Sequence, residues 1–229
     1  ITKTFTISGA FSIPNASAVS IGTNLTTSGN QTYGSGTNAL PVSLLINPTL
    51  DTSGSNANIQ FYGAVDGAQA LTMTTGTGNT TFSSAVGSVT PLSTLTITTN
   101  VFNATALAAN GLISITNSGT SAITGTIKDG ITAASFTKLG SGTLTFSGTN
   151  TYTGNTTITA GTLSVTSGTS INSVSGGNLG GNGQITLNGG TFNILNGTYP
   201  FVSSNAFALN ASSTLTNNNS AASLTGVIS

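Results

Sequence analysis

The chain has 229 residues and no net charge, and three lysines and three aspartates are its only charged side chains. Histidine, cysteine and tryptophan are absent, so most groups that transfer protons, attack substrates or bind metals tightly are missing. This composition argues against an enzyme, a cofactor site and a metal site, and the lack of a basic patch argues against nucleic acid and anionic lipid as partners.

The low charge is explained neither by a membrane span nor by disorder. A spanning helix needs about 18–20 consecutive apolar residues, whereas the longest apolar-rich stretch, residues 39–46, is short and contains Pro41. Disorder usually combines low hydrophobicity with high net charge, whereas this chain has a mean hydropathy of +0.24 and regularly spaced aliphatic residues. We therefore expect a folded segment that does not insert into a membrane.

Alternation of aliphatic and hydroxyl side chains predicts β-strands along the whole chain, and no segment has the period of an amphipathic helix. The alternating runs, in chain order, are residues 4–8, 71–74, 95–98, 112–116, 143–147, 157–159, 162–166, 184–188 and 214–216. Small residues separate the runs, and the pairs Asn110–Gly111, Asn188–Gly189 and Asn196–Gly197 suit tight turns with positive φ. The chain is predicted to be all-β.

An internal repeat predicts how these strands are organised. Asn30, Asn58 and Asn79 are each followed three residues later by an aromatic residue, and the second interval between these copies is shorter than the first. Both intervals fall within the repeat length of about 20–30 residues that is typical of a β-solenoid, in which each coil covers the apolar face of the next. We predict a parallel β-helix with turns of about 20–28 residues. It should be right-handed, because crossovers between parallel strands almost always are.

A second repeat relates the two ends of the chain. Residues 123–128 are similar to residues 224–229, and residues 1–9 resemble a shortened form of residues 136–148, which follow the first copy. We therefore expect residues 1–229 to form a single continuous solenoid that is a segment of a longer repeat array.

A more specific pattern covers residues 135–165. Its elements, in order, are Lys138, Gly140, Gly142, Leu144, Phe146, Gly148, Asn150, Tyr152, Gly154, Ile158, Gly161 and Leu163. This order and spacing closely resemble the passenger-associated transport repeat of bacterial autotransporters, with Asn155 at a position where a second glycine is common.

The resemblance implies a right-handed parallel β-helix that is secreted or displayed on the outer surface of a Gram-negative bacterium. In such a coil, corners are expected at Gly140, Gly142 and Gly154. The interior is expected to hold Leu144, Phe146, Ile158, Leu163 and Val165. We expect Tyr152 to stack on aromatic rings of neighbouring turns, Lys138 to lie on the surface, and stacked asparagines to form hydrogen-bond ladders.

The acidic residues form no catalytic or metal-binding pattern. Asp51, Asp66 and Asp129 lie far apart, and the last two each precede a glycine, which is typical of turns. Residues 176–183 are faintly similar to a calcium-binding nonapeptide repeat, but they lack the aspartate that such a site requires. Neither a cofactor nor a metal is expected.

These features predict a non-catalytic structural module of a bacterial cell-surface or extracellular fibre, acting as a stalk, adhesin or filament subunit. Low charge and open solenoid ends favour self-association, by axial stacking or through neighbouring repeats. One alternative is an adhesin passenger with a face for a glycan or protein of a host surface or other cells. Another is an ice-binding solenoid, since Thr-x-Thr pairs recur at residues 72/74, 94/96, 143/145, 157/159 and 214/216. Threonine is also simply a good solvent-facing strand residue.

Overall fold

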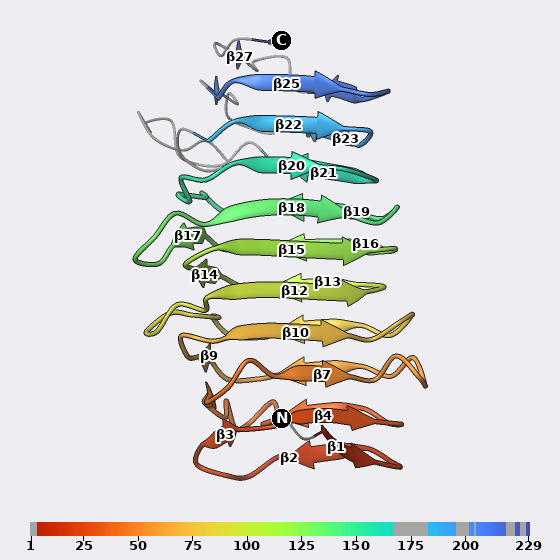
Figure 1. Cartoon of the computed structure of the whole chain (residues 1–229), viewed down its shortest axis with the longest axis vertical. Coiled ribbons are helices and arrows are strands. Elements are labelled where there is room, and N and C mark those ends of the chain that lie inside the picture. Colours follow the sequence, from red (N-terminus) through yellow and green to blue (C-terminus); the bar gives the residue numbers. More distant parts are fainter. Residues whose placement is uncertain (1–3, 167–182, 196–201, 204, 219–222, 225–227) are drawn as a thin grey trace.

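The computed structural model describes residues 4–166, 183–195, 202–203, 205–218, 223–224 and 228–229. Within these ranges the regular structure consists of 27 β-strands, and no helix is present that is long and apolar enough to cross a membrane. Pairing between these strands is parallel throughout. The chain is therefore a parallel β-solenoid, with its coils stacked along one axis (Figure 1).

The first sheet contains ten strands, each contributed by a different coil. Its strands, in order, are β1 (Thr4–Ile7), β4 (Asn24–Thr27), β7 (Thr49–Asp51), β10 (Ala70–Thr74), β12 (Thr94–Thr99), β15 (Leu112–Asn117), β18 (Ser135–Leu139), β20 (Thr156–Ile158), β22 (Ile185–Asn188) and β25 (Phe207–Asn210). Most of the alternating runs predicted from the sequence lie in this sheet.

The second sheet also contains ten strands, and each follows a strand of the first sheet after a short corner. Its strands, in order, are β2 (Phe11–Ile13), β5 (Gln31–Tyr33), β8 (Ile59–Phe61), β11 (Thr80–Phe82), β13 (Phe102–Ala104), β16 (Thr120–Ile123), β19 (Thr143–Phe146), β21 (Thr162–Val165), β23 (Thr191–Ile194) and β26 (Thr214–Asn217).

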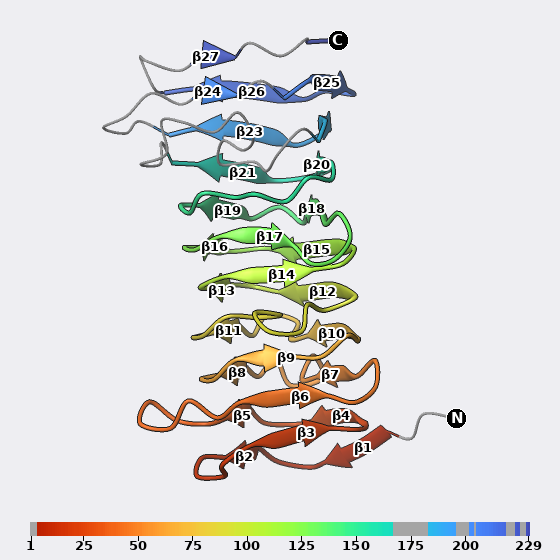
Figure 2. The ribbon, with the colours of Figure 1, turned by 90° about the vertical axis from the view of Figure 1, so that its left-hand side faces the viewer.

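A third side closes each coil less regularly. Its paired strands are β3 (Val19–Ile21), β6 (Val42–Leu44) and β9 (Val65–Asp66), then β14 (Leu107–Ala109) with β17 (Ile127–Asp129), and β24 (Val202–Ser203) with β27 (Ser223–Leu224). Val86 connects the first two groups through single parallel bridges to Val65 and Leu107. Figure 2 shows this side of the molecule facing the viewer.

The length of a coil varies with its loops, while the strands stay in register. Leu95 pairs with Ile113 across one of the shortest coils, whereas Thr156 pairs with Ile185 across one of the longest. The first of these coils is slightly shorter, and the second slightly longer, than the range predicted from the sequence. The right-handed winding stays a prediction.

The core consists of inward side chains that stack in columns along the axis. One column of the first sheet contains Leu25, Leu50, Met73, Ile97 and Ile115, and all five are buried. Each member covers the next and removes it from water, which contributes about 1.5–3 kcal/mol for each large aliphatic side chain. The alternation read from the sequence thus places the core correctly.

Two of the three predicted Asn–Gly turns lie in the described ranges. Gly189 has a φ of 101°, which confirms the prediction there, whereas Gly111 does not adopt positive φ. Asn110 acts between coils instead, because its Oδ1 accepts a hydrogen bond from the Ile131 N–H at 2.6 Å. The pair at residues 196–197 lies outside the described ranges, as do residues 176–182 of the segment compared with a calcium repeat.

The two segments of the longer repeat occupy different sides of the solenoid. Ile123 ends β16 in the second sheet, whereas Leu224 lies in β27 on the third side. Ile228 then bridges to Phe207 of the first sheet. The similarity of the two segments is therefore not a similarity of position, and membership of a longer array stays a prediction.

Candidate functional site

Asparagine side chains connect successive coils at the start of the second sheet. Asn30 Oδ1 accepts a hydrogen bond from the Asn58 N–H at 2.9 Å, and Asn58 Oδ1 accepts one from the Asn79 N–H at 2.8 Å. The side-chain oxygen satisfies a backbone donor that would otherwise have no partner at the corner. Asparagines thus form a ladder along the axis, but each of these contacts joins a side-chain oxygen to a backbone N–H, whereas stacked side chains were expected.

Other corners use the same contact, with an asparagine or aspartate oxygen as acceptor and a backbone N–H of the following coil as donor. The acceptor–donor pairs are Asn24–Thr49, Asn47–Ala70, Asn56–Thr77, Asp66–Val89, Asn110–Ile131, Asp129–Thr153 and Asn155–Gln184. Asp51 instead accepts from the N–H and hydroxyl of Ser53 in its own turn. All three carboxylates thus accept hydrogen bonds from their own turn or from the following coil. The described residues contain no group of three or more potential metal ligands.

Aromatic rings form a column beside the asparagine ladder. The rings of Tyr33 and Phe61 are 4.4 Å apart and nearly parallel at 5°, and those of Phe61 and Phe82 are 5.2 Å apart at 20°. Phe11 and Phe102 extend the column at its two ends, with centroid distances of 5.5 and 6.1 Å to Tyr33 and Phe82. Each Asn-x-x-aromatic copy therefore supplies one ladder amide and one stacked ring.

Residues 136–165 form two rungs that pair with each other. Phe136–Lys138 of β18 pairs with Thr156–Ile158 of β20, and Thr143–Phe146 of β19 pairs with Thr162–Val165 of β21. The two Thr-Leu elements of the sequence pattern are therefore stacked directly on one another. The side chains expected in the interior are all buried, namely Leu144, Phe146, Ile158, Leu163 and Val165.

The glycines of this segment lie where adjacent coils approach most closely. Gly140 and Gly161 turn the corner between the two sheets with φ of 74° and 64°. At Gly142, Gly148 and Gly154, an added Cβ would lie 2.2–2.3 Å from a carbonyl oxygen of the coil below. Only glycine fits such positions, so the glycines in the sequence mark where one coil passes close to the backbone of the coil below.

A comparison with known families agrees with this geometry. Residues 136–165 match the passenger-associated-transport-repeat model. The resemblance proposed from the sequence is thereby confirmed over these residues, and it implies a secreted or surface-displayed protein of Gram-negative bacteria. Comparisons with curated proteins and with solved structures gave no match.

Two further members of the passenger-associated repeat secure the third side of the coil. Asn150 is buried, and its Oδ1 accepts a hydrogen bond from the Ile127 N–H at 2.7 Å. Tyr152 is also buried, with its hydroxyl 2.6 Å from that of Thr156, and burial raises the pKa of Tyr152. The expectation that Tyr152 stacks on aromatic rings is wrong, since it has no stacked ring among the described residues. The aromatic column lies in the upstream coils instead.

The lysine of the repeat contradicts the expectation of a surface position. Lys138 pairs with Ile115 and Ile158, which places it in a column of buried aliphatic residues, and it is fully buried. Its ammonium donates to the carbonyl oxygens of Leu139 at 2.7 Å and Gly140 at 2.9 Å. The sequence does contain a signal for this position. Lys138 is two residues after the buried Phe136 on the same strand, and residues two apart on a strand face the same side of the sheet.

Burial lowers the pKa of Lys138 from its usual 10.5 to about 8, because the charged form loses water. The folded chain therefore binds this proton less tightly than the unfolded chain. The cost of charging Lys138 is present below the folded pKa and disappears as pH rises towards the unfolded value. The free energy of unfolding should consequently increase between about pH 8 and 10. Near pH 10 the buried tyrosines begin to oppose this rise, because in the unfolded chain they ionise near their usual pKa of 10.0.

Thermal unfolding of the wild type and of Lys138→Met across this pH range checks the prediction. The rise should vanish in the variant, and a rise of equal size in both proteins would contradict it. Neighbouring elements offer no competing titration near pH 8, since β15, β18, β19 and β20 contain no other ionisable side chain. The nearby Tyr152 hydroxyl is bonded to Thr156, and burial moves its pKa upward, away from this range.

The outward face of the first sheet carries a continuous column of hydroxyl groups. Its members are Thr49, Thr72, Thr96, Ser114, Thr137, Thr157 and Thr186, one in each of seven successive coils. The corresponding column of the second sheet is mixed, since Asn103 and Ala122 separate Thr81 from Thr145. One face of the solenoid therefore carries a regular hydroxyl column, in which Ser114 is buried, and Asp51 lies in the neighbouring column of the same face.

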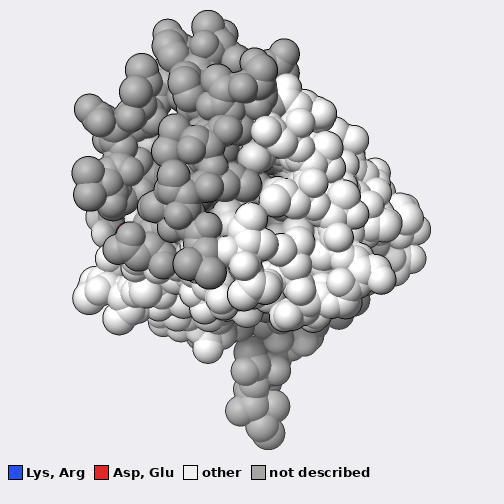
Figure 3. All heavy atoms as spheres, turned by 90° about the horizontal axis from the view of Figure 1, so that it is seen from above, with Lys and Arg blue, Asp and Glu red and all other residues white. Residues whose placement is uncertain are grey.

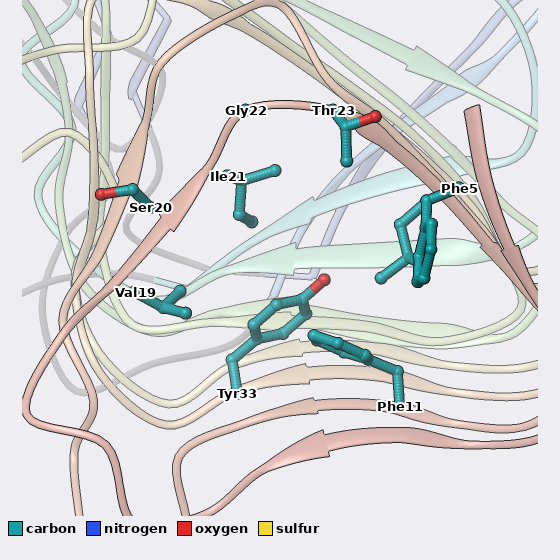
Figure 4. Close-up of a pocket in the computed structure, with 9 residues that line it drawn as sticks. Phe5, Phe11, Val19, Ser20, Ile21, Gly22, Thr23 and Tyr33 are labelled. Atoms are coloured by element: carbon teal, nitrogen blue, oxygen red, sulfur yellow. The ribbon is translucent and has the colours of Figure 1, made fainter. Parts of the chain in front are cut away.

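The described surface at the C-terminal end of the solenoid shows neither lysine nor aspartate when it is seen along the axis (Figure 3). At the N-terminal coil, Phe5, Phe11 and Tyr33 line a hollow of about 110 Å³ together with Val19 and Ile21 (Figure 4). Phe5 is 57% exposed, so this coil presents apolar side chains beside the strand edges of β1 and β2.

Proposed function

We propose that this chain is a non-catalytic structural module of a Gram-negative cell-surface or extracellular protein, serving as a stalk or filament segment. The main support for this proposal is that ionisable side chains of the chain form hydrogen bonds with the backbone. Lys138, Asp66 and Asp129 are engaged by backbone atoms at coil corners, where they stabilise the stack. Groups engaged in this way are poorly suited to exchange protons with a substrate.

Shape and turnover measurements test this role together. Ten rungs at a spacing of roughly 4.8 Å give a rod on the order of 50 Å long, which small-angle scattering of the isolated chain should detect. A screen against polysaccharides and peptides should give no turnover. Turnover that is lost in Asp129→Asn would overturn the structural role, because that substitution removes one carboxylate and keeps an oxygen acceptor.

We further propose that the N-terminal coil accepts another coil of the same kind, supplied in the isolated protein by a second copy of the chain. The apolar hollow beside Phe5 and the edges of β1 and β2 support this, because stacked coils bury such surface and pair such edges. With almost no charge on the chain, little electrostatic repulsion opposes the contact.

Replacing Phe5 by lysine is expected to weaken this association, because a charge would enter the apolar contact. Sedimentation velocity should show a wild-type species that grows with concentration, and Phe5→Lys should shift that growth to higher concentration. The matched control is Val89→Lys, at an 83% exposed side chain outside the hollow. A wild type that stays monomeric at every concentration would contradict the stacking proposal without affecting the scaffold role.

The hydroxyl column of the first sheet favours ice as a second candidate ligand. Six threonines and Ser114, one in each coil, place hydroxyl groups at regular spacing along the axis, as an ordered water lattice would require. Thermal hysteresis measures the activity directly. Wild-type hysteresis should be lost in Thr96→Lys and kept in Thr145→Lys, which alters the second sheet, and no hysteresis in the wild type would eliminate this candidate.

A further inference from the structure

Interior polar side chains cap the corner between the first and second sheets in successive coils. The Thr75 and Thr99 hydroxyls lie 2.9 and 3.0 Å from the Gly78 carbonyl oxygen. In the next coil, the Asn117 amide donates to the Gly119 carbonyl oxygen at 2.6 Å. These buried donors give the corner carbonyl oxygens a second hydrogen bond, because Gly78 O also accepts from the Asn100 N–H and Gly119 O from the Thr143 N–H of the next coil.

The coil that follows cannot be capped from the same position. One residue beyond the Thr116–Leu139 pair stands Gly140, where an added Cβ would lie 2.4 Å from the Asn117 carbonyl oxygen. The donor comes instead from Lys138, two residues earlier on the strand. Its side chain runs inside the coil and places Nζ 2.7 Å from Leu139 O and 2.9 Å from Gly140 O.

The same ammonium also reaches the coil beyond. The corner there contains Ala160, which has no side-chain donor, and the Ala160 carbonyl oxygen is 3.4 Å from Lys138 Nζ. Three carbonyl oxygens from two coils thus surround one ammonium, which has three N–H donors. In the coil below, the buried Oδ1 of Asn117 has no hydrogen-bond partner, so the corner is rich in acceptors.

We infer that this corner is an internal site for a primary amine or ammonium group, built from backbone carbonyl oxygens of two coils and occupied by the chain's own lysine. Lys138 therefore links the two rungs of the passenger-associated repeat through the N–H donors of its tethered amino group. A shortened side chain would vacate the site for ammonium or a small primary ammonium ion.

Chemical rescue of Lys138→Ala tests the inference. The variant should lose on the order of 5 °C in Tm, because buried carbonyl oxygens lose their donor. Methylammonium chloride should restore part of that loss in a saturable manner. Tetramethylammonium chloride at equal concentration has no N–H donor and should restore none, and the wild type should respond to neither salt beyond ionic strength.

Two comparisons separate the site from general destabilisation. Lys128→Ala removes an exposed lysine and should neither lower the Tm nor respond to methylammonium. Equal rescue of Lys138→Ala by both salts, or an unchanged Tm in that variant, would overturn the inference. If the variant does not fold, NMR of the wild type decides instead. The Lys138 ammonium should then give a slowly exchanging N–H signal, and rapid exchange like that of Lys128 would count against a closed site.

Discussion

Replacing Gly161 by alanine is expected to lower the free energy of unfolding by about 2–5 kcal/mol. Gly161 has a φ of 64°, where a side chain costs about 1–2 kcal/mol. An added Cβ would also lie 2.4 Å from the carbonyl oxygens of both Gly140 and Gly142. Backbone atoms cannot yield as a flexible side chain can, so overpacking adds about 1–3 kcal/mol. Denaturant unfolding monitored by circular dichroism measures the sum.

The matched control is Gly54→Ala, because nothing lies within 4 Å of a Cβ added at Gly54 and its φ is not positive. That substitution should change stability by no more than about 0.5 kcal/mol. Equal losses in the two variants would show that the effect comes from glycine replacement in general and not from the close approach of two coils.

Replacing Phe61 by alanine should cost about 3–5 kcal/mol, with a further 0.5–1.5 kcal/mol for each lost ring contact. Phe61 is fully buried and stacked between Tyr33 and Phe82, so its removal opens a cavity and interrupts the aromatic column. Each coil of a solenoid contacts only its neighbours. Amide exchange should therefore accelerate first in β5, β8 and β11 and much less in β20 and β21.

Phe5→Ala provides the comparison, because Phe5 is the same residue type on a strand of the first sheet and its side chain is 57% exposed. Its loss should stay well below that of Phe61→Ala. A double-mutant cycle with Phe82→Leu separates ring contact from simple volume, since a coupling energy near zero would mean that the rings contribute only buried area. Uniform acceleration of exchange along the chain would contradict the nearest-neighbour account.

The sequence was sufficient for the architecture because the solenoid repeats its own local signals. Alternation in residues 71–74 and 95–98 corresponds to β10 and β12, and the aromatic residues after Asn30, Asn58 and Asn79 lie in one column. The register follows from that spacing, since a one-residue shift would expose the buried face. The shortest strands, such as β9 and β14, were not predicted, because two or three residues give no period.

The position of Lys138 was not predictable from residue type alone. Lysine is almost never fully buried unless its charge is satisfied, and here the partners are carbonyl oxygens that meet only after two coils have stacked. The same limit applies to Gly111 and Tyr152. Their local sequence suggested a positive-φ turn and a stacked ring, but contacts with the neighbouring coil and with Thr156 determine their conformations.

The direction of the asparagine and aspartate contacts gives the stack a polarity. In the ladder that contains Asn30 and Asn58, the side-chain acceptor always belongs to the earlier coil and the backbone donor to the later one. Along this ladder, one edge of a coil therefore offers side-chain oxygen acceptors and the opposite edge offers backbone N–H donors, whereas Asn150 on the third side accepts in the opposite direction, from the Ile127 N–H of the earlier coil. Copies that stack through these edges would join head to tail. Such a heterologous contact, repeated along a common axis, does not close into a ring, so symmetry sets no limit to the number of copies.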